Sequence, residues 1–277
     1  MTRETRHGTR EGTSSRVPLS YGGLERSYRL HVPPSAGPYP LVMMLHGAGG
    51  DAEFAARETG WSNLADSEGF AVVYPEGVPV RRDKAPKFLT NPLEWTDGSG
   101  RGGADDVGFL VAVLDDVAHR VAIDRRRVYV TGFSNGAGMA FRFAAEQADR
   151  VAALAPVAGH LWVRDSKPSR PVPTIYMVGD ADPLVPLDGG TARTPWGSVE
   201  NRPAVAGTLA SWGRAVGSQP GSDLFPVRVI PGHGHHWPGG RALMGERLGG
   251  PASDRVNATS EIWRFFRNLT TDASGRP

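Results

Sequence analysis

The sequence of 277 residues contains no cysteine. Disulfide bonds, thiolate metal sites and a cysteine nucleophile are therefore excluded, and the fold must form without covalent cross-links. Covalent catalysis, if present, must use another side chain, such as a serine hydroxyl.

Long apolar runs are also missing. No segment approaches the roughly 20 apolar residues of a membrane-spanning helix, so a membrane partner has no support. The first residues are rich in Thr, Arg and Gly and lack the apolar core of a signal peptide. We therefore expect residues 1–16 to form a disordered lead-in and the protein to be cytoplasmic. A secreted chain whose leader had been removed would show the same pattern.

Neither sign of charge is in excess, because 31 Lys and Arg residues accompany 29 Asp and Glu residues, for a formal net charge of +2. The basic residues are scattered. Their one short cluster, 125–127, stands directly before an apolar run and indicates a solvated turn. A nucleic-acid partner is therefore not favoured.

Glycine and proline are plentiful, with 36 and 23 copies, which predicts many turns and long connections. Short apolar runs alternate with segments of helical periodicity, as in a mostly parallel sheet with helices on both faces. The first strand or two can be antiparallel. The predicted strands are 26–32, 41–45, 71–74, 127–131, 152–157, 174–178 and 227–230. The predicted helices are 105–121, 135–148, 203–216 and 253–269.

One segment, residues 78–103, fits neither period. Loops of this length within a compact domain are usually functional or disordered. This one follows the strand predicted at 71–74, and ligands bind at the carboxyl ends of such strands. We expect a single α/β domain over residues 17–270 with this loop at its surface, and a flexible tail at 271–277.

A strand, a tight turn and a helix surround Ser134 in the motif Gly132-Phe-Ser-Asn-Gly136. This is the setting of a nucleophile elbow in an α/β-hydrolase fold, where glycines permit close approach of the neighbouring backbone. Ser134 is therefore the predicted nucleophile. The alternative is that its side chain only caps the following helix.

A serine nucleophile needs a base and a carboxylate that orients the base, and in this fold they follow the serine in the order acid, then histidine. Asp182, after the strand predicted at 174–178, is the favoured acid, with Asp180 as the alternative. His235 is the favoured base, with His233 and His236 as alternatives. The three histidines lack a second ligand cluster, so we expect no metal.

An oxyanion hole requires two backbone N–H groups. Asn135 directly follows the nucleophile and supplies the first. The Gly-rich segment after the strand predicted at 41–45 supplies the second, with Ala48 as the expected donor.

These motifs together resemble the polyhydroxybutyrate (PHB) depolymerase and feruloyl esterase group, which is similar to carbohydrate esterase family 1 of the α/β-hydrolase superfamily. In that pattern the aspartate stands three residues after a glycine and the histidine two residues before Trp-Pro, which implies Asp182 and His235. The resemblance covers residues 24–269. Its elements are Leu45-His46-Gly47, the run 105–109, the 132–136 elbow, Gly179 with Asp182, and Gly234-His235 with Trp237-Pro238.

Secreted depolymerases of that group usually carry a leader, disulfides and often a separate polymer-binding domain, none of which this sequence shows. We therefore expect a serine esterase that forms an acyl-enzyme without a cofactor, and that acts on soluble, short-chain or oligomeric esters rather than crystalline polymer. His46, Trp95 and Trp237 are assigned to substrate binding, the tryptophans as flat walls for an acyl group. The two tryptophans could equally be core residues.

Two other interpretations stay open. A peptidase or an acyltransferase can use the same three catalytic residues. A non-catalytic binding protein can also be built on a hydrolase fold, because a fold does not determine a function. The ordered set of serine, aspartate and histidine argues against the second.

Overall fold

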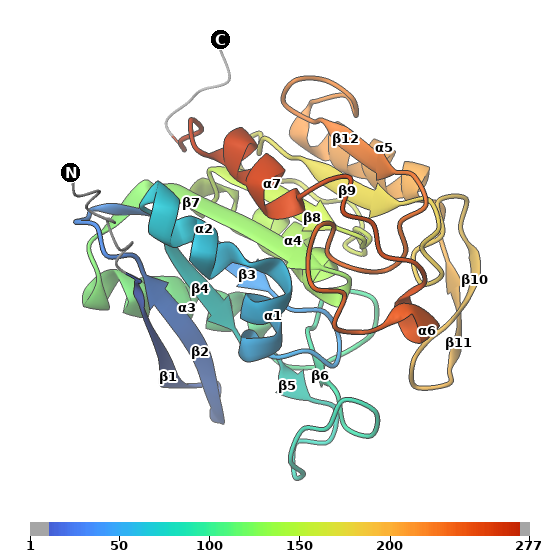
Figure 1. Cartoon of the computed structure of the whole chain (residues 1–277), viewed down its shortest axis with the longest axis horizontal. Coiled ribbons are helices and arrows are strands. Elements are labelled where there is room, and N and C mark those ends of the chain that lie inside the picture. The colour runs from blue at the N-terminus through green and yellow to red at the C-terminus, as the bar shows by residue number, and fades with distance from the viewer. Residues whose placement is uncertain (1–10, 272–277) are drawn as a thin grey trace, which may run out of the picture.

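An eight-stranded sheet forms the centre of the computed structural model, which describes residues 11–271 (Figure 1). Parallel pairing joins β4, β3, β7, β8, β9 and β12, in that spatial order, whereas β1 and β2 are antiparallel additions at one edge. The predicted mostly parallel sheet is confirmed. In spatial order the strands are β1 (Thr13–Tyr21), β2 (Leu24–Val32), β4 (Ala71–Pro75), β3 (Tyr39–Leu45), β7 (Ile123–Phe133), β8 (Ala153–Val157), β9 (Tyr176–Gly179) and β12 (Val227–Ile230).

Helices cover both faces of this sheet, as Figure 1 shows. Residues of α3, α4 and α5 belong to one buried cluster, and residues of α1, α2 and α7 belong to the other. These helices therefore form the outer layers of a single three-layer domain. Their bounds are α1 (Ala52–Thr59), α2 (Trp61–Glu68), α3 (Asp106–Arg120), α4 (Asn135–Glu146), α5 (Val205–Val216) and α7 (Ala258–Phe266).

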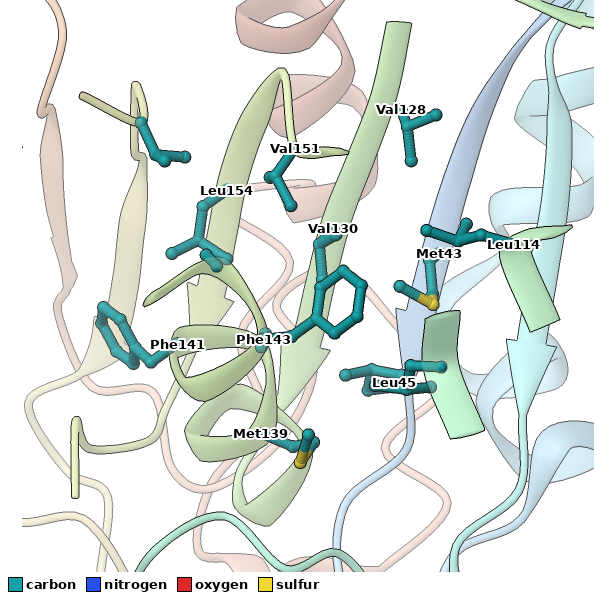
Figure 2. Packing of buried hydrophobic residues seen from close by; sticks show 14 of the residues in the cluster. Met43, Leu45, Leu114, Val128, Val130, Met139, Phe141, Phe143, Val151 and Leu154 are labelled. Carbon is teal, nitrogen blue, oxygen red and sulfur yellow. The ribbon is translucent and has the colours of Figure 1, made fainter. Parts of the chain in front are cut away.

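Strand β3 shows how one short apolar run serves both layers. Its side chains alternate between the faces of the sheet, so Met43 and Leu45 enter one cluster while Val42 and Met44 enter the other. Figure 2 shows the first of these clusters, with Met43 and Leu45 beside residues of α4. A strand buried on both faces has no polar side, which explains why its sequence is apolar throughout.

Two parts of the N-terminal half differ from the sequence-based prediction. Residues Thr13–Arg16, expected within the disordered lead-in, belong to β1, while residues 1–10 lie outside the described part of the chain. As an edge strand, β1 buries only Val17, so it lacks the apolar alternation of an inner strand. Helices α1 and α2 were not predicted; each spans eight residues, and Gly60, with φ 69°, separates them.

The segment 78–103 is an ordered loop with a short antiparallel pairing of β5 (Val78–Pro79) with β6 (Leu93–Glu94). A second hairpin, which was not predicted, consists of β10 (Gly190–Arg193) and β11 (Val199–Arg202). Both extend from the same end of the domain, where the short helix α6 (Glu246–Gly249) also lies (Figure 1). This end is the carboxyl edge of the parallel strands, where open α/β sheets bind ligands.

A buried ion pair joins β2 to α3. Arg26 Nη1 lies 2.7 Å from Asp106 Oδ1, and both side chains are almost fully buried. The Arg26 guanidinium also stacks 3.5 Å from the ring centre of Phe109. Removing one partner would leave the other charge buried and unpaired.

We predict that Asp106→Ala lowers the free energy of unfolding by about 3–5 kcal/mol. Urea unfolding followed by circular dichroism measures this. The control is Glu146→Ala, which removes an exposed i,i+4 pair with Arg142 and should lose about 1 kcal/mol or less. Equal losses in the two variants would contradict the assignment of Arg26 and Asp106 as an energetically important pair.

Candidate active site

Ser134 stands between the end of β7 and the start of α4, in a backbone conformation that is rare for a non-glycine residue (φ 57°, ψ −119°). Its N–H group donates to the carbonyl of Val157 on the next strand, at 3.0 Å. A Cβ atom on Gly132 would lie 2.2 Å from the carbonyl oxygen of Gly136, and one on Gly136 would lie 2.3 Å from that of Leu45. Both glycines are therefore required by the tight strand-to-helix turn.

Asp182 and His235 form a buried pair in which His235 Nδ1 lies 2.7 Å from Asp182 Oδ2. The other carboxylate oxygen of Asp182 accepts hydrogen bonds from the N–H groups of Leu184 and Val185, each at 2.8 Å. Burial alone would raise the pKa of Asp182, but the charge and hydrogen bond of His235 and these two N–H groups outweigh it and lower the pKa. The carboxylate is therefore ionised at neutral pH.

The loop after β12 carries His235 to the serine. The N–H of His235 donates to the carbonyl of Gly249 at 2.5 Å, and the imidazole of His235 lies 4.7 Å, centre to centre, from the ring of Phe133. Ser134 and His235 both line one cavity of about 310 Å³. The structure thus brings together Ser134, Asp182 and His235, the three residues favoured by the sequence.

The alternative residues make other contacts. Asp180 accepts a hydrogen bond from the N–H of Gly232, which supports the turn after β12. The imidazoles of His233 and His236 lie within hydrogen-bond distance of main-chain carbonyls, at 3.0 Å and 2.9 Å. His233 thus holds the histidine loop, whereas His236 holds the loop and also lines the cavity.

Ala48 and Asn135 also line the cavity, one on each side of the elbow. Asn135 is the first residue of α4, so its N–H group has no acceptor within the helix. The helix dipole adds a partial positive charge at this end. Both predicted oxyanion donors therefore lie at the cavity that Ser134 lines.

The structure corrects the assignment of His46, Trp95 and Trp237 to substrate binding. All three are at most 1% exposed, and none belongs to the lining of the cavity. Trp95 Nε1 donates to the carbonyl of His46, and Trp237 Nε1 donates to Thr259 Oγ1. His46 Nε2 accepts from the N–H of Gly77. Each is a satisfied core residue, which is the alternative that the sequence left open for the two tryptophans.

Other aromatic residues form the walls, and the sequence reasoning did not identify them. Phe88, from the 78–103 loop, and Trp196, from the turn between β10 and β11, meet at the cavity with ring centres 6.1 Å apart. Trp196 Nε1 donates to the carbonyl of Phe88 at 2.6 Å. Phe54, Phe133 and Trp162 complete the lining by Phe and Trp side chains. The only available signal was the length of the 78–103 loop.

His160 is a further polar residue of the lining that was not predicted. It is 2% exposed, and its Nδ1 lies 3.1 Å from Thr208 Oγ1. Burial, reinforced by the positive charge of Arg202, lowers the pKa of His160 to about 4, so this imidazole is neutral at pH 7.

Within residues 11–271 no group of His, Asp or Glu side chains is arranged to hold a metal ion. Over the same residues, no helix combines the length and the apolar character needed to cross a membrane.

The elbow, the buried histidine–aspartate pair and the mostly parallel sheet define the class of the protein as a serine hydrolase of the α/β-hydrolase fold. The model of the esterase PHB depolymerase family matches residues 26–169. The chain belongs to this family. Its elbow lies within the matched region, whereas Asp182 and His235 follow it.

Curated relatives cover nearly the whole chain. One, named "Putative esterase NocK", from Nocardia uniformis subsp. tsuyamanensis, is 34% identical over 289 aligned residues, which cover 91% of this chain and 81% of the relative. Feruloyl esterase C of Emericella nidulans is 26% identical over 270 residues, which cover 94% and 92% of the two chains. The protein is a serine-based carboxylic-ester hydrolase.

Among solved structures, an S-formylglutathione hydrolase from Agrobacterium tumefaciens superposes with a TM-score of 0.64 at 14% identity, over 97% of this chain and 99% of the other. A ferulic acid esterase superposes with a TM-score of 0.58 at 16% identity, over 82% and 92%. At these identities the likeness establishes the fold alone.

The low pKa of His160 predicts a dependence of stability on pH. The ordinary pKa of a histidine is 6.5, and the pKa of His160 in the folded protein is about 4. Between these pH values His160 is protonated in the unfolded chain but neutral in the folded chain. The contribution of neutral His160 to the free energy of unfolding is therefore complete above about pH 6.5. It is lost as the pH falls toward 4, by up to about 1.4 kcal/mol per pH unit.

Urea unfolding between pH 7.5 and 4.5 tests this for the wild type and for His160→Gln. The variant should lose less stability on acidification than the wild type. His119→Gln, an exposed substitution on α3, is the matched control and should behave as the wild type. Parallel curves for wild type and His160→Gln would contradict the prediction.

Proposed function

We propose that this esterase cleaves soluble, short-chain or oligomeric esters with Ser134 as nucleophile, His235 as general base and Asp182 as the carboxylate that orients the base. The observation that carries the proposal is the buried 2.7 Å contact of His235 with Asp182, on a cavity that Ser134 shares. A serine hydroxyl is a weak nucleophile until a positioned base removes its proton.

In the first step His235 Nε2 takes the proton of Ser134 as the serine oxygen attacks the ester carbonyl carbon. The N–H groups of Ala48 and Asn135 donate to the developing oxyanion. The protonated His235 then gives its proton to the leaving alcohol, which departs from the acyl-enzyme. Water then attacks the acyl carbon while His235 accepts a proton from it. His235 returns this proton to the Ser134 oxygen as the bond between that oxygen and the acyl carbon breaks, which releases the acid.

Asp182 serves this cycle by holding the imidazole and not by accepting the proton. Its contact with Nδ1 leaves Nε2 as the nitrogen that faces the serine proton, and its negative charge stabilises the imidazolium that forms. The two N–H groups that bind its other oxygen keep the carboxylate ionised.

The size of the cavity favours an ester with a compact acyl or alcohol group as substrate, rather than a polymer surface. Its volume is about 310 Å³, and Phe88 and Trp196 meet across part of it. Flat apolar side chains suit an aromatic or short aliphatic group. A relative from Paucimonas lemoignei, named a poly(3-hydroxyalkanoate) depolymerase, is 35% identical over 120 residues. This relative and feruloyl esterase C suggest hydroxyalkanoate oligomers and ferulate esters as the first substrates to test.

Ser134→Ala should remove the esterase activity, with a loss in kcat of at least about 10⁴-fold. The assay is hydrolysis of p-nitrophenyl acetate and butyrate, together with labelling by a fluorophosphonate. The control is Ser67→Ala, which changes an exposed serine of α2 that contacts the carbonyl of Leu64 and should still be labelled. Wild-type activity equal to that of Ser134→Ala, with no labelling, would refute the proposed nucleophile.

Trp196→Ala should weaken the preference for aromatic substrates. Removing this wall should lower kcat/KM for methyl ferulate, which has an aromatic acyl group, by about tenfold, while p-nitrophenyl acetate, whose acetyl group is too small to fill the same space, loses less. The control is Val199→Ala on the same hairpin, a side chain that is 57% exposed. Equal losses for both esters in Trp196→Ala would show that the tryptophan supports the fold and not the substrate.

A further inference from the structure

We propose that the segment Leu93–Asp97, hereafter the brace, sets the spacing between the two N–H groups that stabilise the oxyanion. The inference rests on the proposed function, in which Ala48 and Asn135 supply these groups. Trp95 and Asp97 are then positioning residues, which act on the reaction through the two donors.

On one side the brace holds Asn135. The side-chain amide of Asn135 pairs with the main chain of Trp95 in both directions: Oδ1 accepts from the Trp95 N–H at 2.8 Å, and Nδ2 donates to the Trp95 carbonyl at 3.1 Å. The same Nδ2 donates to Asp97 Oδ2 at 2.8 Å. Both hydrogens of the amide are engaged, so Asn135 is tied to the brace in one orientation.

On the other side the brace holds the loop that carries Ala48. Trp95 Nε1 donates to the carbonyl of His46 at 2.9 Å, and the N–H of Gly49 donates to the carbonyl of Leu93 at 2.8 Å. These two contacts lie on either side of Ala48 in the chain. They therefore restrain Ala48, the residue of this loop proposed as an oxyanion donor.

The brace is itself anchored in the core. The N–H of Thr96 donates to Asp106 Oδ2 at 2.7 Å, and Asp106 is the partner of buried Arg26. The carbonyl of Thr96 accepts from Arg142 of α4 at 2.6 Å. Trp95 and Asp97 are at most 1% exposed. A segment held from beneath in this way can transmit a fixed distance between two loops.

The chemistry depends on that distance. Oxyanion donors act when both lie about 2.7–3.1 Å from the developing charge, and an error near 1 Å can slow a reaction by about 100-fold. Loops alone would hold two donors from different strands loosely. The brace gives them a common support.

Asp97→Asn tests the Asn135 side without changing volume. Asp97 accepts at both oxygens, with Oδ1 receiving the N–H and hydroxyl of Ser99 and Oδ2 receiving Asn135 Nδ2. An asparagine has one acceptor, so either orientation sets a donor against a donor. We expect kcat to fall by about tenfold or more, with KM for p-nitrophenyl butyrate little changed.

Trp95→Phe tests the Ala48 side, because it removes the N–H that donates to His46. For both variants, kcat is counted per active site labelled by a fluorophosphonate, so unfolded protein does not enter the rate. Rates are compared for an ester and its thiono counterpart, in which sulfur replaces the carbonyl oxygen. The preference for oxygen is the ratio of kcat for the ester to kcat for its thiono counterpart. Sulfur accepts hydrogen bonds weakly, so a displaced oxyanion hole, which also donates less well to oxygen, should lower this ratio.

Asp66→Asn is the matched control, since this carboxylate contacts Gly12 and His31 instead. It should keep the wild-type kcat and the wild-type oxygen preference. Should Trp95→Phe fail to fold, the isosteric Asp97→Asn decides.

Unchanged kcat in labelled Asp97→Asn, or a fall in kcat with an unchanged preference for oxygen, would overturn the positioning role. A failure of the proposed function looks different, because Ser134→Ala would then match the wild type and labelling would be absent.

Discussion

The backbone of Ser134 is the constraint around which the rest of the site is built. A residue with φ 57° and ψ −119° carries strain of about 1–3 kcal/mol, and such strain persists only where the surroundings impose it. Here the surroundings are a hydrogen bond to Val157 and three glycines that admit close backbone contacts. Gly159 is the third, since a Cβ there would lie 2.4 Å from the Ser134 carbonyl oxygen.

The parallel sheet brings the other groups to the same edge of the domain. Strands β3, β7, β9 and β12 run in the same direction, so the loops at their carboxyl ends meet at one edge. Each loop delivers one component, and the proposed brace then fixes the distance between the two oxyanion donors. In chain order the components are Ala48, Ser134, Asp182 and His235.

This arrangement explains which parts could be predicted from the sequence. Apolar runs for inner strands and the order of serine, aspartate and histidine are local or linear features, and residues 227–230 were predicted with their observed bounds. The edge strand β1 and the short helices α1 and α2 bury too little to leave a strong periodic signal. Family resemblance sharpened the choice of Asp182 over Asp180, because both follow the same strand.

The aromatic residues show the opposite case. Trp237 stands within the histidine motif and Trp95 in the 78–103 loop, yet both are core residues, and their indole groups are satisfied by internal acceptors. The residues that face the cavity, Phe88 and Trp196, are 108 positions apart and meet only because two loops fold toward each other. Whether an aromatic side chain faces substrate is thus decided by tertiary contacts that no local pattern records.

A division of labour follows from this geometry. The catalytic groups stand directly after sheet strands, whereas Phe88 and Trp196 belong to hairpins that extend from the domain and touch the catalytic framework at Gly49. A Cβ on Gly49 would lie 2.6 Å from the Phe88 ring, so this glycine admits the aromatic wall beside the oxyanion loop. Changes in the two hairpins can therefore reshape the acyl site while the brace and the buried histidine–aspartate pair keep the reaction geometry.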